Sequence, residues 1–133
     1  MEEAKSSFEN LEVWQLSRSL RRELSSLARS LPVDERFRLA DQVVRASRSV
    51  TANIAEGHGR YHYQENIQYC RQARGSLHEL IDHLTVALDE NYIDATAFSE
   101  LKARVNEIIR KLNGYIHYLS QRKKQVKGDE CKA

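Results

Sequence analysis

The sequence predicts an all-α protein, an antiparallel up-down-up-down four-helix bundle. Apolar residues recur at spacings of three and four along four long segments, which is the period of an amphipathic helix. The 133 residues include one proline and five glycines, so few positions interrupt these segments, and an all-β fold with many turns is excluded. Short connections between long helices make consecutive helices antiparallel neighbours.

The first helix is predicted between Leu11 and Leu31. Asn10 is a suitable N-cap, and Pro32 ends the helix because proline disfavours helical backbone in the residue before it. The second helix is predicted to open with Asp34 as its N-cap and to end at the Gly-His-Gly of residues 57–59. We expect Phe37 to lie on its apolar stripe, which is otherwise rich in small residues that let a neighbouring helix approach closely.

The third helix is predicted from Tyr63 to Glu90, and the fourth follows a turn at residues 91–94. Glycine inside a helix costs about 1 kcal/mol relative to alanine, so Gly75 indicates a close helix contact. Some apolar residues lie outside the main stripes and require either a widened core or an oligomer interface. They are Leu11, Trp14, Tyr69, Ile81, Ile109 and Ile116.

One domain is expected, with a flexible N-terminus over residues 1–9, the bundle over residues 10–121 and a basic, disordered tail over residues 122–133. From residue 121 onward five basic residues face two acidic ones, so the tail is either a solvated end or an electrostatic arm. The sequence contains neither an apolar run of about 18 residues nor an apolar leader. Cys70 and Cys131 form no disulfide framework, which favours a reduced, cytoplasmic setting.

A polar motif, R-A-S-R-S-V-T-A-N-I-A-E-G-H-G, occupies residues 45–59. Ser49, Asn53 and Glu56 recur at helical spacing and share a face of the second helix, which Gly57 follows. Polar residues in such a position either cross-link the helix to its neighbours and fix the packing register, or form a site for a ligand or partner.

This motif and four others give the chain a resemblance to the four-helix-bundle protein family encoded in intervening sequences of bacterial 23S ribosomal RNA genes. The other segments are L-E-V-W-Q at residues 11–15, P-x-x-E-R-F at 32–37, G-S-L-H-E-L at 75–80 and N-Y-I at 91–93. The family often has proline where this chain has Thr51, so the second helix is expected to be straighter here.

The resemblance implies a bundle that assembles into a homo-oligomeric ring, commonly a pentamer. Relatives of this fold accompany the reverse transcriptases of diversity-generating retroelements, where a basic ring binds protein and nucleic acid. RNA or a ribonucleoprotein is therefore the partner that the resemblance suggests. The family name records a genomic location and implies no ribosomal role.

Basic side chains are the predicted nucleic-acid-binding residues. Three arginine pairs lie about one helical turn apart, and a ring would repeat them around its axis and strengthen their field. Pairing with nearby carboxylates such as Glu12, Asp41, Glu79 and Asp82 is the alternative. The predicted residues are Arg18, Arg22, Arg45, Arg48, Arg60, Arg71, Arg74, Lys123 and Lys124.

Aromatic side chains alternate with basic ones around the connection between the second and third helices. Tyr61, Tyr63 and Tyr69, interleaved with Arg60 and Arg71, form a pattern that can stack single-stranded bases. The alternative is that these rings pack at the start of the third helix and hydrogen-bond at its rim.

We expect no catalytic residue, cofactor, metal ion or membrane contact. The Gly-His-Gly segment lacks the Lys-Ser/Thr ending of a phosphate-binding loop, and the spacing of the histidines does not suit a metal site in a bundle. The sequence therefore predicts a non-enzymatic, ring-forming RNA or ribonucleoprotein binding module. The alternatives are a protein-interaction scaffold without a nucleic-acid role, and an enzyme whose pocket between subunits uses groups such as Glu56, His58 and His62.

Overall fold

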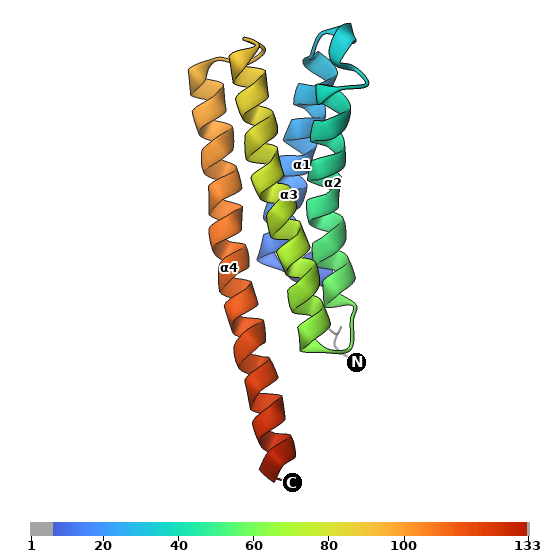
Figure 1. The fold of residues 1–133 in the computed structure, drawn as a ribbon, viewed down its shortest axis with the longest axis vertical. Helices are drawn as coiled ribbons and strands as arrows, with labels where there is room; N and C mark the ends of the chain where they lie inside the picture. Colours follow the sequence, from blue (N-terminus) through green and yellow to red (C-terminus); the bar gives the residue numbers. More distant parts are fainter. Residues whose placement is uncertain (1–6, 133) are drawn as a thin grey trace.

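The computed structural model describes residues 7–132, and four long helices make up most of this range (Figure 1). These are α1 (Glu12–Ser30), α2 (Leu39–His58), α3 (Tyr63–Asp89) and α4 (Ala95–Lys132), with short 3-10 turns η1 (Phe8–Asn10) and η2 (Val33–Glu35). Each helix packs against the next one in the chain, and α1 also contacts α4, which closes the bundle. The predicted all-α four-helix bundle is confirmed.

The core runs along the bundle axis and is built from the predicted stripes. Its largest fully buried side chains include Leu20, Leu24, Ile54, Leu77, Leu80, Leu84 and Leu112. Ile116 is buried, and Leu11, Trp14, Ile81 and Ile109 are half-buried against the core. Five of the six off-stripe residues therefore widen the core of the single chain, and the sixth, Tyr69, is half-buried outside this core cluster.

The predicted starts of α1 and α2 were wrong. Leu11, not Asn10, is the N-cap of α1, because Asn10 belongs to η1. Helix α2 begins at Leu39, because residues 33–35 form the 3-10 turn η2. The Glu35 carboxylate accepts the Leu39 N–H at 3.2 Å. Phe37 precedes α2 and is 82% exposed, so it is not part of the apolar stripe.

The close approach between helices occurs at Gly57 and not at Gly75. A Cβ added at Gly75 would meet nothing within 4 Å, so the expected contact there is absent. A Cβ at Gly57 would lie 2.7 Å from Asn66 Oδ1 and 2.8 Å from Tyr69 Cβ on α3. Gly57 therefore allows the last turn of α2 to lie directly against the first turns of α3.

Helix α4 is longer than expected. The predicted boundary at residue 121 differs from the structure, in which the helix continues to Lys132 and projects past the other helices (Figure 1). Residues 121–127 are mostly lysine, arginine and glutamine, which favour helix even where no neighbour packs against them. The predicted flexibility of residues 1–6 lies outside the described residues, and residues 8–10 form η1. Within the described range, no helix combines the length and hydropathy needed to cross a membrane.

Candidate nucleic-acid interface

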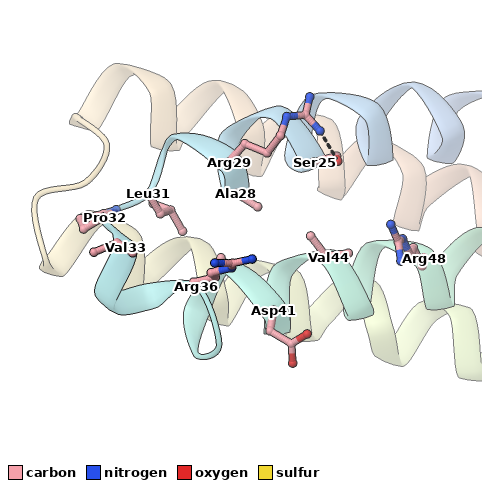
Figure 2. Close-up of a pocket in the computed structure, with 11 residues that line it drawn as sticks. Ser25, Ala28, Arg29, Leu31, Pro32, Val33, Arg36, Asp41, Val44 and Arg48 are labelled. Atoms are coloured by element: carbon pink, nitrogen blue, oxygen red, sulfur yellow. Dashed lines mark hydrogen bonds between the residues drawn. The ribbon is translucent and has the colours of Figure 1, made fainter.

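A groove between α1 and α2 is lined by apolar residues at its base and by arginines around it. Its larger hollow has a volume of about 680 Å³, and Figure 2 shows Ala28, Leu31 and Val44 pointing into it, with Arg29, Arg36 and Arg48 around it. A second hollow shares Arg29, Val44 and Arg48 with the first and adds Arg21 and Arg22. A third hollow, lined by residues of α1, shares Arg22 with the second and adds Arg18.

We call these three neighbouring hollows together the α1–α2 groove. Its arginines come from successive turns of α1, from the connection that contains η2 and from the middle of α2. They are Arg18, Arg21, Arg22, Arg29, Arg36 and Arg48.

Three of these arginines contact neutral groups. Arg21 donates a hydrogen bond to Thr51 Oγ1 at 2.9 Å, Arg29 donates to Ser25 Oγ at 3.1 Å, and the Arg18 guanidinium lies 5.9 Å from the Trp14 ring centre. In the part of the chain that the structure describes, none of the six arginines forms an ion pair. Within the described residues, the positive charge of these six arginines is therefore not neutralised by ion pairs.

One carboxylate, Asp41, is found among the described residues that line the groove. Its partner is Arg45, at 3.8 Å, and the Arg45 side chain is 78% exposed. The predicted pair of Arg45 and Arg48 is thus divided by the structure, because Arg48 lines the groove and Arg45 does not. Arg22 and Arg48 line the same hollow, and Arg18 lines the neighbouring hollow on α1 together with Arg22.

The polar motif of α2 contacts the helices on both sides. Asn53 donates to the Ser49 carbonyl at 2.9 Å and to Ser49 Oγ at 3.0 Å, and Ser76 of α3 donates to the same Oγ at 2.8 Å. Thr51 meets α1 through Arg21. Glu56 lies outside this network, since its carboxylate accepts from Arg60 at 2.7 Å.

The remaining predicted basic residues lie on other elements. Arg60 follows α2 and donates to the Tyr69 hydroxyl at 2.7 Å, while Arg74 of α3 donates to Asn113 Oδ1 of α4 at 2.7 Å. Arg71 is exposed on α3. Lys123 of α4 donates to Gln64 at the start of α3, and its neighbour Lys124 is exposed.

A separate hollow of about 320 Å³ lies where the α2–α3 connection meets α4. Its lining is rich in aromatic and imidazole rings and, in the described chain, contains no carboxylate. The residues are His58, Arg60, Tyr61, His62, Tyr63, Asn66, Tyr115, Tyr118 and Leu119.

Among the described residues, no group of three or more histidine, cysteine or acidic side chains could hold a metal ion. His83 is buried and lies 3.0 Å from the Glu79 carboxylate, an arrangement that satisfies a core histidine. Cys70 is also buried, and this burial raises the pKa of its thiol to about 12. The thiol therefore stays protonated and is a poor nucleophile.

The family model of the 23S rRNA-intervening sequence proteins matches residues 9–114. The chain belongs to this family. The fold is similar to that of a protein of unknown function from the S23 ribosomal protein family of Bacteroides thetaiotaomicron, with a TM-score of 0.74 and 21% sequence identity over 79% of this chain and 95% of that chain. No curated protein matches the chain.

The family match includes the whole α1–α2 groove but not the last part of α4. Residues 115–132 follow the matched range, and they include Tyr115, Tyr118 and Lys123. The hollow at the α2–α3 connection is therefore built partly from residues outside the matched range.

Several residues of both surfaces were not predicted from the sequence. The groove also contains Arg21, Arg29 and Arg36. The sequence held a signal for Arg29, because it follows Arg22 by seven residues on one helix and so shares a face with the predicted pair of Arg18 and Arg22. Tyr115 and Tyr118 lie about one turn apart on α4, but their proximity to the α2–α3 connection follows from the tertiary fold.

Proposed function

We propose that this member of the family is a non-enzymatic, homo-oligomeric helical bundle that binds RNA or a ribonucleoprotein through the α1–α2 groove. The observation that carries this proposal is the set of groove arginines that lack an ion pair within the described chain. Guanidinium groups bind phosphate oxygens with two parallel hydrogen bonds, and each phosphate contact releases condensed counterions from the nucleic acid.

The length of the groove suits a polyanion better than a single small anion. Arg18 and Arg29 are separated by eleven positions of α1, which is roughly 16 Å at 1.5 Å per residue. Phosphates of one RNA or DNA strand follow one another at a few ångströms along a duplex axis, about 3.4 Å in B-form DNA. Several successive phosphates can therefore face the arginines of one protomer.

Assembly would multiply this effect. The formal net charge of the chain is only +2, so a single protomer attracts a polyanion weakly over long distances. A ring would repeat the groove around its axis. Val33 and Phe37, which are 78% and 82% exposed beside the groove, are apolar side chains that contact with another copy would cover.

The test measures the affinity of the full chain for a structured RNA across a series of salt concentrations. Arg48→Gln removes a groove charge, whereas Arg71→Gln removes an exposed charge on α3 outside the groove. We expect binding to weaken as salt rises, and Arg48→Gln to lower affinity and reduce the slope of log K against log salt by about one. Arg71→Gln should change neither quantity.

Two results would contradict the proposal. One is wild-type protein that does not retain RNA at low salt. The other is an equal loss of affinity in the two variants, which would show that total charge matters and the groove does not. The first result would favour a scaffold that assembles with protein partners without a nucleic-acid role, whereas the second would keep RNA binding but remove the groove as its site.

A further inference from the structure

The hollow at the α2–α3 connection combines open aromatic rings with a rigid base. Tyr61 is 92% exposed and Tyr118 is 54% exposed, whereas Tyr63 and Tyr115 are half-buried and Leu119 is buried. Exposed rings of this size are not needed for the core. They leave flat apolar faces open to whatever enters the hollow.

The rings are held in defined orientations. Tyr115 and Tyr118 lie with their centroids 6.3 Å apart and their planes 14° from parallel, and Tyr61 meets His62 edge to face at 4.8 Å and 83°. Both separations fall within the range of attractive aromatic pairs, about 4.5–7 Å. Tyr118 thus packs against Tyr115, and Tyr61 against His62, through contacts within the chain.

A buried hydrogen bond fixes the base of the hollow. Asn66, which is 7% exposed, donates from Nδ2 to the Tyr115 hydroxyl at 3.2 Å and accepts from Cys70 Sγ at 3.5 Å. Burial raises the pKa of Tyr115, so its hydroxyl remains neutral at physiological pH. Tyr115 is thus a fixed, uncharged wall of the hollow.

Positive groups surround the rings. Arg60 lines the hollow, and its guanidinium lies 5.0 Å from the Tyr69 ring centre. A hydrogen bond with Tyr63 raises the pKa of Arg122, and Lys123 lies one residue further along α4. Of the nearby carboxylates, Glu56 is paired with Arg60, and Glu65 lies in the first turn of α3 outside the lining.

We propose that this hollow binds the base of an unpaired nucleotide of an RNA strand by stacking on Tyr61 and Tyr118, with the adjoining phosphates near Arg122 and Lys123. Stacked aromatic rings beside cations, with no carboxylate in the lining, match a flat base attached to a phosphate chain. A volume of about 320 Å³ is at the lower end of the range of ligand sites, which suits one base and excludes a packed helix.

This inference rests on the proposed function and specifies the RNA further, because it requires an unpaired segment. The two surfaces share no lining residue. The α1–α2 groove meets phosphates of any sequence, whereas the hollow distinguishes a strand with free bases from one whose bases are paired or missing.

The experiment compares a labelled single-stranded RNA with an abasic strand of the same length and charge, each titrated with the full chain. Stacking contributes about 1–3 kcal/mol per base, so the base-bearing strand should bind about 5- to 150-fold more tightly. Tyr61→Ala and Tyr118→Ala should remove most of this ratio. Tyr118→Phe, which keeps the ring, should preserve it, and circular dichroism confirms that each variant is folded.

The inference fails if both strands bind equally to the wild type, or if the alanine variants leave the ratio unchanged. The Arg48→Gln variant separates this failure from failure of the groove. If Arg48→Gln weakens both strands alike while the ratio is one, the groove binds RNA and the hollow does not. If the ratio persists while Arg48→Gln has no effect, the hollow binds bases and the groove is not the phosphate site.

Discussion

Gly57 shows at the scale of one residue how the end of α2 is positioned. The space for its missing side chain is filled by Asn66 and Tyr69 of α3, including the backbone oxygen of Asn66 at 3.1 Å from an added Cβ. Asn66 and Tyr69 also contact Tyr115 and Arg60, respectively, at the proposed base-stacking hollow. The helix contact at Gly57 therefore bears directly on the geometry of the hollow.

We predict that Gly57→Ala destabilises the protein by about 1–3 kcal/mol, the usual cost of overpacking a filled interface. The backbone of α3 cannot retreat without moving its first turns. The loss should appear as a lower midpoint in urea unfolding at a fixed protein concentration.

Gly75→Ala is the matched control in the neighbouring helix. A Cβ at this position meets nothing within 4 Å, so alanine adds helix propensity without a clash. We expect it to stabilise the protein by about 0.5–1 kcal/mol. A similar loss in both variants would show that helix geometry in general, and not the contact with Asn66 and Tyr69, determines the effect at Gly57.

At the scale of elements, one hydrogen bond joins the two connections at the same end of the bundle. The Tyr92 hydroxyl, in the α3–α4 connection, donates to Glu35 Oε2 of η2 at 2.7 Å, while Glu35 Oε1 accepts the Leu39 N–H at the start of α2. The bonds from Tyr92 and from Leu39 lower the pKa of Glu35, and the bond to Glu35 raises the pKa of Tyr92 to about 12. The Glu35 carboxylate thus accepts the first N–H of α2 and links the start of this helix to the α3–α4 connection.

We predict that this bond gives stability that disappears in acid. A carboxyl whose pKa is lower in the folded protein binds fewer protons when folded, so the free energy of unfolding rises with pH between the two pKa values. The contribution should be complete above the ordinary pKa of 4.5 and be lost as pH falls through the lower folded value. Thermal unfolding midpoints of wild type and Tyr92→Phe, measured across acidic pH, provide the comparison.

The difference between the two proteins should be largest near neutral pH and shrink in acid. On the alkaline side, the raised pKa of Tyr92 predicts a further loss as pH rises from 10 towards about 12. Glu107, whose pKa is also lowered, chiefly by its hydrogen bond with Arg110, is present in both proteins and cancels in the comparison. A difference that stays constant from neutral to strongly acidic pH would contradict the assigned role of Glu35.

The sequence predicted the long elements better than their starts. Helix α3 was expected from Tyr63 to Glu90 and spans Tyr63–Asp89, because a stripe of apolar residues continues over its whole length. Asp34 has the intrinsic preference of an N-cap, but it lies within the 3-10 turn η2, and the oxygen that accepts the Leu39 N–H comes from Glu35. Which of two adjacent acidic residues caps a helix depends on where the chain turns, and spacing alone does not show this.

The candidate surfaces could be predicted only in part, because spacing along one helix shows which residues share a face but not which residues of other helices lie beside them. Arg18 and Arg22 share a helix face by spacing, and the structure places Arg48 of α2 beside them. Arg45 precedes Arg48 by three residues, which is less than one full turn, so the two side chains leave the helix in different directions; Arg45 pairs with Asp41 and does not line the groove. Tyr118 joins the α2–α3 connection only through the packing of α3 against α4.

At the scale of the whole molecule, exposed apolar residues are concentrated where they contribute little to the single-chain fold. Val33 and Phe37 lie in the α1–α2 connection beside the arginine groove, and the Arg36 guanidinium lies 5.2 Å from the Phe37 ring centre. Because five of the six off-stripe residues of the helices already pack on the core, this connection is the better candidate for contact between copies in the proposed ring.

We predict that Phe37→Glu lowers the mass of the assembly measured by light scattering after size exclusion, without reducing helix content. Phe37 is 82% exposed in the chain, so its replacement should leave the fold intact, whereas a charge buried between copies is costly unless it is paired. Tyr61→Glu, at a residue 92% exposed in the α2–α3 connection, is the control and should keep the wild-type mass. An unchanged mass for Phe37→Glu would remove this connection from the interface, and a monomeric wild type would contradict the ring itself.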